Sequence, residues 1–317
     1  MSVCLKEMPL ARFSSEMLAS LAVQAAVLEA AATRKPGLVC MDTRGVHSDM
    51  DIRILVASAF SLHSYFMRAA EYGRTHAEAA PHDFFQHLRS LGRKAESDMF
   101  GLTGGVNTHK GLIFSQGLIC AAAGRLAARE GTANAVAICA EASSLVQGIL
   151  ERDLVPLGKA GKFEPTVQPW EEYLRAARQR IGRDLSAGEA LYLRYAATGI
   201  RGEAEHGFPH ALLGLQSLWD ESAHGDFNRA ILHALLALMG KMRDTNVLWR
   251  GGPEKLQAVQ AMARRILELG GTISPAGKAA LEELQSYCLA YRLSPGGCAD
   301  MLNIALFFYL LLPPDSA

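Results

Sequence analysis

Charged residues and glycines gather in six short segments that separate long apolar stretches. The segments are 33–37, 45–51, 103–111, 198–203, 244–252 and 294–300. Basic side chains stand in four of them: Lys35, Lys110, Arg201 and Arg250. Carboxylates stand in the same group of segments: Asp49, Asp51, Glu203, Asp244 and Asp300. Most of these segments come just before an expected helix, so their polar groups belong to helix N-termini.

This combination of residue types is typical of a site for phosphate groups. Glycine lets backbone amides approach a ligand, and a helix N-terminus offers free N–H groups with a partial positive charge. Basic side chains mixed with carboxylates favour a polyphosphate whose charge is shared with Mg²⁺, because Mg²⁺ prefers carboxylate oxygens. Each segment alone has a simpler interpretation, since Thr, Ser, Asp and Asn are ordinary N-caps and glycine commonly ends helices. Six segments of one character favour a binding site.

The sequence lacks the motifs of three other kinds of site: a Walker A phosphate loop, a zinc site and a catalytic triad. The stretch Gly104-Gly105 to Lys110 differs from a Walker A loop, because no glycine precedes the lysine and no strand precedes the loop. No H-E-x-x-H motif or Cys/His cluster indicates zinc, and no nucleophile elbow indicates a catalytic triad. Two histidines, His47 and His109, lie in the polar segments and are candidates for substrate contact.

Apolar residues recur at three- and four-residue spacing along almost the whole chain, which predicts an all-α fold. We expect a single compact domain of about twelve helices over 14–317, preceded by an N-terminal extension at 1–13. The proline-rich stretch 152–169 is expected to be a long surface loop. The expected helices are 14–33, 50–72, 82–99, 108–129, 132–151, 170–181, 186–197, 203–221, 226–241, 253–269, 275–290 and 298–312.

The composition indicates a globular protein and argues against nucleic-acid-binding and membrane-spanning classes. The 317 residues are 50% apolar and 20% charged, as in an ordinary globular protein. Lys+Arg and Asp+Glu number 32 each, so the global basic charge of a nucleic-acid-binding protein is missing. The longest apolar run, 304–312, is too short to span a membrane. Six scattered cysteines indicate buried reduced thiols and a cytoplasmic location.

Taken together, the polar segments resemble the triphosphoribosyl-dephospho-CoA synthase family, which makes the prosthetic-group precursor of citrate lyase and malonate decarboxylase. The matching motifs are KPGLV (35–39), HSDMD (47–51), TGGVNTHKG (103–111), TGIRGEAEHGF (198–208), LMGKMRDTN with RGG (238–252) and LSPGGCADML (293–302). They run in the family's order and cover nearly the whole chain outside 1–13 and 152–184. Arg34 and Cys40-Met41 depart from the family's usual residues without removing a lysine or a carboxylate.

The resemblance implies transfer of the 5-triphosphoribosyl group of ATP to the 2′-hydroxyl of 3′-dephospho-CoA, with release of adenine. The implied phosphate ligands are Lys35, Lys110, Arg201 and Arg250, and the implied Mg²⁺ ligands are Asp49, Asp51 and Asp244. Glu203 is the first choice for the general base. His109 is a candidate proton donor to adenine, His47 a candidate substrate contact, and Asp300 and Asn107 candidates for contact with ribose or metal.

The resemblance also implies a partner, a transferase that loads the product onto an acyl carrier protein. It implies neither nucleic acid nor a membrane, and it leaves the oligomeric state open, with a homo-oligomer among the options. Two rival functions fit the residues. One is a helical, Mg²⁺-dependent hydrolase of N-glycosidic bonds, akin to ADP-ribosyl glycohydrolases. The other is a non-catalytic helical partner protein in which the polar segments are only helix caps.

Overall fold

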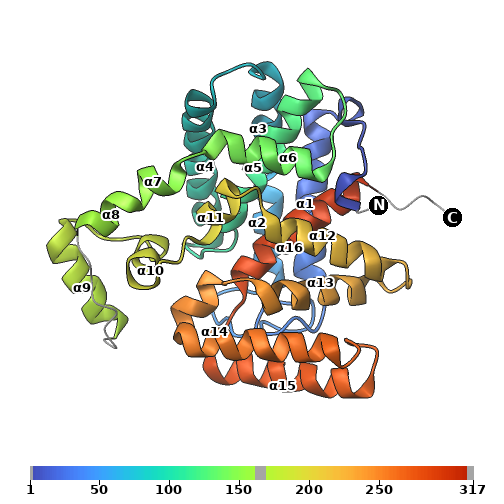
Figure 1. The fold of residues 1–317 in the computed structure, drawn as a ribbon, viewed down its shortest axis with the longest axis vertical. Coiled ribbons are helices and arrows are strands. Elements are labelled where there is room, and N and C mark those ends of the chain that lie inside the picture. Colours follow the sequence, from blue (N-terminus) through green and yellow to red (C-terminus); the bar gives the residue numbers. More distant parts are fainter. Residues whose placement is uncertain (1–2, 161–168, 313–317) are drawn as a thin grey trace.

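A computed structural model describes residues 3–160 and 169–312, and within these ranges the fold is all-α, as predicted (Figure 1). The first helices are α1 (Ser15–Ala31), α2 (Ile52–Ser61), α3 (His63–Thr75), α4 (Pro81–Thr103), α5 (Lys110–Arg129), α6 (Ala135–Val146), α7 (Ile149–Asp153) and α8 (Val155–Ala160). The remaining helices are α9 (Trp170–Ile181), α10 (Ala187–Tyr195), α11 (Gly199–Glu205), α12 (Pro209–Ser222), α13 (Phe227–Lys241), α14 (Thr245–Glu268), α15 (Pro275–Tyr291) and α16 (Gly296–Leu311).

Side-chain caps explain where many of these helices begin. The side chains of Asp51, Asn134 and Asp226 accept hydrogen bonds from backbone N–H groups in the first turns of α2, α6 and α13. Ser186 and Glu189 form a reciprocal capping box at the start of α10. Such caps satisfy donors that have no partner within the helix.

Three expected helices are each divided in two. The expected helix 50–72 is interrupted at Leu62. The expected helix 132–151 is interrupted at Gln147, which ends α6, and at Gly148, whose positive φ precedes α7. The expected helix 203–221 is separated by Gly207 and Phe208, both with positive φ, before Pro209 starts α12. Two of the three breaks thus coincide with residues at positive φ, a backbone conformation that an α-helix cannot contain.

The expected loop at 152–169 is wrong for its first part. Residues 152–153 complete α7 and residues 155–160 form α8, whereas 161–168 lie outside the described residues. Pro156 is compatible with α8 because it occupies the first turn, where its missing N–H would have no helical partner.

The core is built around α5 and α16, which are buried along almost their whole length. Helices α3 and α5 approach closely through Gly73 and Gly124, because a Cβ at either glycine would lie within 2.2 Å of a backbone oxygen of the other helix. By length and composition alone α5 could cross a membrane, but 83% of its apolar window is buried inside the fold, as in the core helix of a globular domain.

The described part of the N-terminal extension belongs to this core. Met8 and Leu10 are fully buried, and Met8 forms an isolated backbone bridge with Ala133. The six cysteines are also buried, as predicted.

Helices α7 to α9 extend from the main body on the left of Figure 1. Helix α9 is joined to α14 by aromatic rings: Trp170 stacks on Trp249 with 4.2 Å between ring centroids, and Trp170 Nε1 donates to the Trp249 carbonyl at 2.8 Å. Helix α14 is interrupted at Gly252, which has φ 71° and is followed by Pro253.

Candidate active site

One large cavity of about 940 Å³ lies among α4, α5, α10, α11, α14, the start of α16 and the segment 38–50. This volume is at the upper end of the usual range for small-molecule sites. Nine of the twelve residues predicted from sequence line it: His47, Asp49, Asn107, His109, Lys110, Arg201, Glu203, Arg250 and Asp300. Segments far apart in the sequence therefore meet at one site.

Lys35 does not line this cavity. Its side chain is almost completely buried, and Nζ donates to Glu29 Oε1 at 2.6 Å and to the Glu29 carbonyl at 2.5 Å. This position gives no support to a phosphate-binding role, because the charge is already neutralised inside the protein.

Asp51 also lies outside the cavity lining. Its Oδ1 caps α2 by accepting from Arg53 N and Ile54 N, and its Oδ2 contacts the guanidinium groups of Arg53 at 2.9 Å and Arg44 at 3.2 Å. The hydrogen bond from Arg53 and the cap lower the pKa of Asp51 to about 2. These partners occupy the oxygens that a metal would need.

Asp244 joins two helix starts. Oδ1 accepts from Asn246 N at 2.8 Å and Val247 N at 3.0 Å, capping α14, and Oδ2 accepts from Cys298 N at 2.8 Å in the first turn of α16. Its exposed fraction is 2%. The carboxylate therefore holds α14 against α16 and, like Asp51, gives no support to the predicted magnesium site.

The described residues contain no group of three or more His, Cys, Asp or Glu side chains arranged to hold a metal ion. The predicted set Asp49, Asp51 and Asp244 is accordingly not gathered. Only Asp49 of the three faces the cavity, where its side chain is 57% exposed and lies 3.7 Å from His47 Nδ1. The donor set does not fit a magnesium site built from these three carboxylates.

Glu203 projects from α11 and is held by a histidine that the sequence analysis did not single out. Glu203 Oε1 lies 2.7 Å from Nδ1 of His210 on α12. Its other oxygen, Oε2, is buried without a hydrogen-bond partner. A buried acceptor with no donor is costly within a folded protein and is a common feature of sites that act on a ligand.

Asp300 stands on the first turns of α16 against the start of α5. A Cβ at Gly111 would lie 1.9 Å from Asp300 Oδ2, so only glycine allows this approach. Burial, together with the nearby carboxylates of Asp244 and Glu29, raises the pKa of Asp300 well above its usual value. Asp300 therefore keeps a proton more readily than an exposed carboxyl group does.

His109 is buried at the start of α5. Its Nδ1 lies 2.8 Å from Ser58 Oγ, and Ser58 Oγ lies 2.6 Å from Thr108 Oγ1. Burial lowers the pKa of His109 to about 4. The imidazole is therefore neutral near pH 7 and can donate a hydrogen bond but carries no positive charge.

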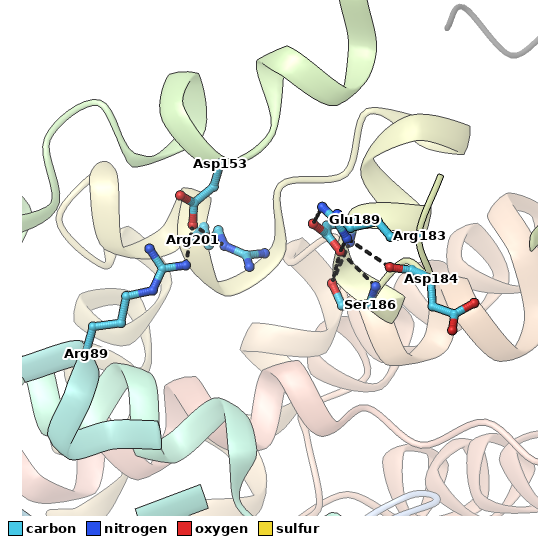
Figure 2. Close-up of polar contacts among 7 residues, drawn as sticks. All are labelled: Arg89, Asp153, Arg183, Asp184, Ser186, Glu189 and Arg201. Atoms are coloured by element: carbon cyan, nitrogen blue, oxygen red, sulfur yellow. Dashed lines mark hydrogen bonds and ion pairs between the residues drawn. The ribbon is translucent and has the colours of Figure 1, made fainter. Parts of the chain in front are cut away.

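The basic residues of the cavity belong to separate elements. Lys110 Nζ lies 2.5 Å from Glu96 Oε1, and Arg250 Nη1 donates to the Arg292 carbonyl. His47 Nε2 lies 2.9 Å from Ser294 Oγ, and burial followed by the charge of Arg250 lowers the pKa of His47. Arg201 lies beside Asp153, which also contacts Arg89 (Figure 2).

Sequence reasoning missed several cavity residues because they lie within regular helices. His210 follows Glu203 by seven residues, and Arg89 and Arg93 occupy one face of α4 at a spacing of four. The i, i+4 spacing of the two arginines was a usable signal for a shared face. Nothing in the sequence shows that this face borders a cavity.

Comparisons with known proteins show what the whole chain is similar to. A family model described as ATP:dephospho-CoA triphosphoribosyl transferase (CitG) matches residues 15–316. A relative from Citrobacter koseri, named "Probable 2-(5''-triphosphoribosyl)-3'-dephosphocoenzyme-A synthase", is 38% identical over 293 residues, covering 91% of this chain and 88% of the relative. A relative from Albidiferax ferrireducens with the same name is 38% identical over 294 residues, covering 92% and 89%.

No solved structure matches the chain. The chain belongs to the ATP:dephospho-CoA triphosphoribosyl transferase family, which confirms the resemblance found in the sequence.

Proposed function

We propose that this protein transfers the 5-triphosphoribosyl group of ATP to the 2′-hydroxyl of 3′-dephospho-CoA and releases adenine. The observation that carries the proposal is one large cavity in a member of this family, in which Glu203, with one unpartnered carboxylate oxygen, is gathered with Asp300, Lys110, Arg201 and Arg250.

The transfer requires one bond to break and one to form. The bond between ribose C1′ and adenine breaks, and C1′ bonds to the acceptor oxygen through a transition state with oxocarbenium character, as in glycoside transfer. Glu203 accepts the proton of the acceptor hydroxyl. The unpartnered Oε2 supports this role, because a hydroxyl would satisfy it, and His210 fixes the other oxygen.

The departing adenine must receive a proton. We assign this step to Asp300, because its raised pKa favours a protonated carboxyl group that can act as an acid. The lowered pKa of His109 makes it a neutral hydrogen-bond donor to the substrate instead. The carboxylate of Asp49 faces the cavity and stabilises the cationic ribose.

The triphosphate stays attached throughout and needs a permanent clamp. Lys110 and Arg250 are the proposed ligands of the triphosphate. Arg201 remains a proposed phosphate ligand, and His47 and Asn107 remain the proposed polar substrate contacts. Magnesium is retained only as a counter-ion that enters with the triphosphate, a mode that needs no more than one or two protein carboxylates. No step above depends on it.

The wider setting is part of the same proposal. The reaction takes place in the cytoplasm, for which six buried thiols are suited, and the product passes to a transferase that loads an acyl carrier protein. The product serves citrate lyase or malonate decarboxylase. A homo-oligomer is compatible with this setting.

One experiment separates this function from its rivals. Purified protein is incubated with ATP and Mg²⁺, with and without dephospho-CoA, and free adenine is measured. We expect adenine release that requires dephospho-CoA. Equal release without the acceptor would instead indicate the N-glycosidic hydrolase, and no release together with no stabilisation by ATP would indicate the non-catalytic partner protein.

A further inference from the structure

One carboxylate in the cavity wall lies between two arginines that come from different helices. Oδ2 of Asp153, at the end of α7, accepts from Arg89 Nη2 of α4 at 3.2 Å and lies 3.4 Å from Arg201 Nε of α11. Figure 2 shows the three side chains meeting from their three helices. All three residues line the cavity.

The group keeps both positive charge and hydrogen-bond donors. Two guanidinium groups against one carboxylate leave one positive charge in excess, and Arg93, one turn further along α4, adds another at the cavity wall. Each guanidinium has five N–H donors, and its contact with Asp153 uses one of them. The Arg89 and Arg201 side chains are 35% and 26% exposed, so the remaining donors are within reach of a ligand.

The position of this group is fixed by α11 itself. Glu205, at the end of α11, accepts from the backbone N–H groups of Gly148 and Leu150 and thereby holds the start of α7. The short helix α7 then carries Asp153 to Arg201. Asp153 and Arg201 are therefore held close to Glu203, which lies two residues from Arg201, and Arg89 reaches this group from α4.

Both substrates carry a phosphate chain on the 5′-carbon of the reacting ribose, so the side of the cavity on which each ribose lies determines which chain meets Arg89 and Arg201. In dephospho-CoA the diphosphate is attached to the 5′-carbon of the same ribose that carries the reacting 2′-hydroxyl. A base on α11 that touches this hydroxyl places the acceptor ribose against α11, with its diphosphate one sugar away. Arg250 and Lys110 lie on α14 and α5 instead, and are left for the triphosphate of ATP.

Resting on the proposed function, we infer that Arg89 and Arg201, held together by Asp153, form the binding site for the diphosphate of the acceptor dephospho-CoA. The guanidinium groups bind the diphosphate oxygens through paired N–H donors, for which Arg is better suited than Lys. Asp153 neutralises part of their charge while the acceptor is absent.

The test measures equilibrium binding of dephospho-CoA and of ATP, each separately, to the full-length protein. Arg89→Gln is expected to weaken dephospho-CoA binding about 10- to 100-fold and to leave ATP binding unchanged within about twofold. Arg89→Lys keeps the charge without the planar fork and is expected to fall between wild type and Arg89→Gln. The matched control is Arg183→Gln, which removes an ion pair with Glu189 at 2.6 Å beside the same region and is expected to change neither affinity (Figure 2).

Three results would overturn the inference: weaker ATP binding with unchanged dephospho-CoA binding, no change in either affinity, or wild-type protein that does not bind dephospho-CoA. Binding needs no turnover, so the inference and the proposed function fail separately. Wild-type protein that binds dephospho-CoA through Arg89 but releases no adenine would support the site and contradict the transfer reaction.

Discussion

Two groups of polar residues with the same sequence signature have different environments. Lys35, Asp51 and Asp244 are paired inside the chain, each with an opposite charge or with backbone N–H groups. Glu203 and Asp300 instead line the cavity, where one has an unpartnered oxygen and the other has a strongly raised pKa. A polar residue at a helix junction therefore indicates a ligand site when the chain itself does not satisfy it.

The largest expected effect concerns Glu203. Glu203→Gln keeps the shape of the side chain but cannot accept a proton, so turnover should fall about 10²- to 10⁴-fold while ATP affinity stays nearly constant. Steady-state rates and ATP binding measure the two effects. Glu282→Gln, the same change at an exposed carboxylate on α15 that does not line the cavity, is the matched control and should keep its turnover. Near-normal turnover in folded Glu203→Gln would contradict its role as the general base.

The next effect concerns stability rather than activity. Lys35→Ala leaves the Glu29 carboxylate buried without its partner, which should lower the free energy of unfolding by about 3–5 kcal/mol. Urea unfolding measures this loss. Lys110→Ala should change stability by at most about 1 kcal/mol, because its pair with Glu96 is half exposed, but should weaken ATP binding by about 1.5–3 kcal/mol. Weaker ATP binding in Lys35→Ala, with unchanged ATP binding in Lys110→Ala, would instead indicate that Lys35 binds phosphate.

Asp244 tests the predicted magnesium role. In Asp244→Asn, an amide replaces one of the two carboxylate oxygens and cannot accept from both helix starts, so we expect a loss of about 1–3 kcal/mol in unfolding free energy. The control Asp226→Asn changes a cap that serves only α13 and should cost less. A collapse of activity that added Mg²⁺ reverses, without a stability loss, would instead support a metal ligand.

The smallest expected effect is a pH dependence of stability. The pKa of His109 is about 4 in the folded protein and about 6.5 when unfolded, so between these values the unfolded state binds the extra proton. Its contribution to stability is complete above pH 6.5 and is lost as the pH falls toward 4. Between pH 7 and pH 5 the free energy of unfolding of the wild type should fall by about 1–2 kcal/mol more than that of His109→Asn. Parallel pH profiles in urea unfolding would contradict a buried neutral His109.

The all-α fold could be predicted because almost every helix carries a periodic apolar pattern. The breaks at Gly148 and at Gly207-Phe208 could not be placed, since glycine is tolerated within helices and only the three-dimensional packing decides. The helical residues 155–160 were missed because proline was treated as a breaker, although it lies in a first turn.

The sequence predicts most of the residues that line the cavity, but it does not predict which polar residues are used inside the protein. Nine polar residues in glycine-rich segments meet at one cavity. Lys35, Asp51 and Asp244 lie in the same kind of segment, but they form ion pairs and helix caps within the protein instead. The difference lies in contacts between distant segments, such as Asp244 with the backbone of Cys298, which no local pattern contains. Arg89 and His210 remained hidden because nothing local separates them from ordinary helical side chains.

Pro253 in α14 affects how α9 is attached to the rest of the fold. In an unbroken helix the Trp249 carbonyl would bond to the N–H of residue 253, which as proline has none. The Trp249 carbonyl therefore has no partner at residue 253, and it accepts a hydrogen bond from the Trp170 indole N–H instead. Helix α9 thus depends for its attachment on a residue that takes no part in that hydrogen bond. Because the backbone at Gly252 already leaves the helix, the Trp170 indole is the donor on which this carbonyl depends, and Trp170→Phe would remove that hydrogen bond while keeping an aromatic ring against Trp249.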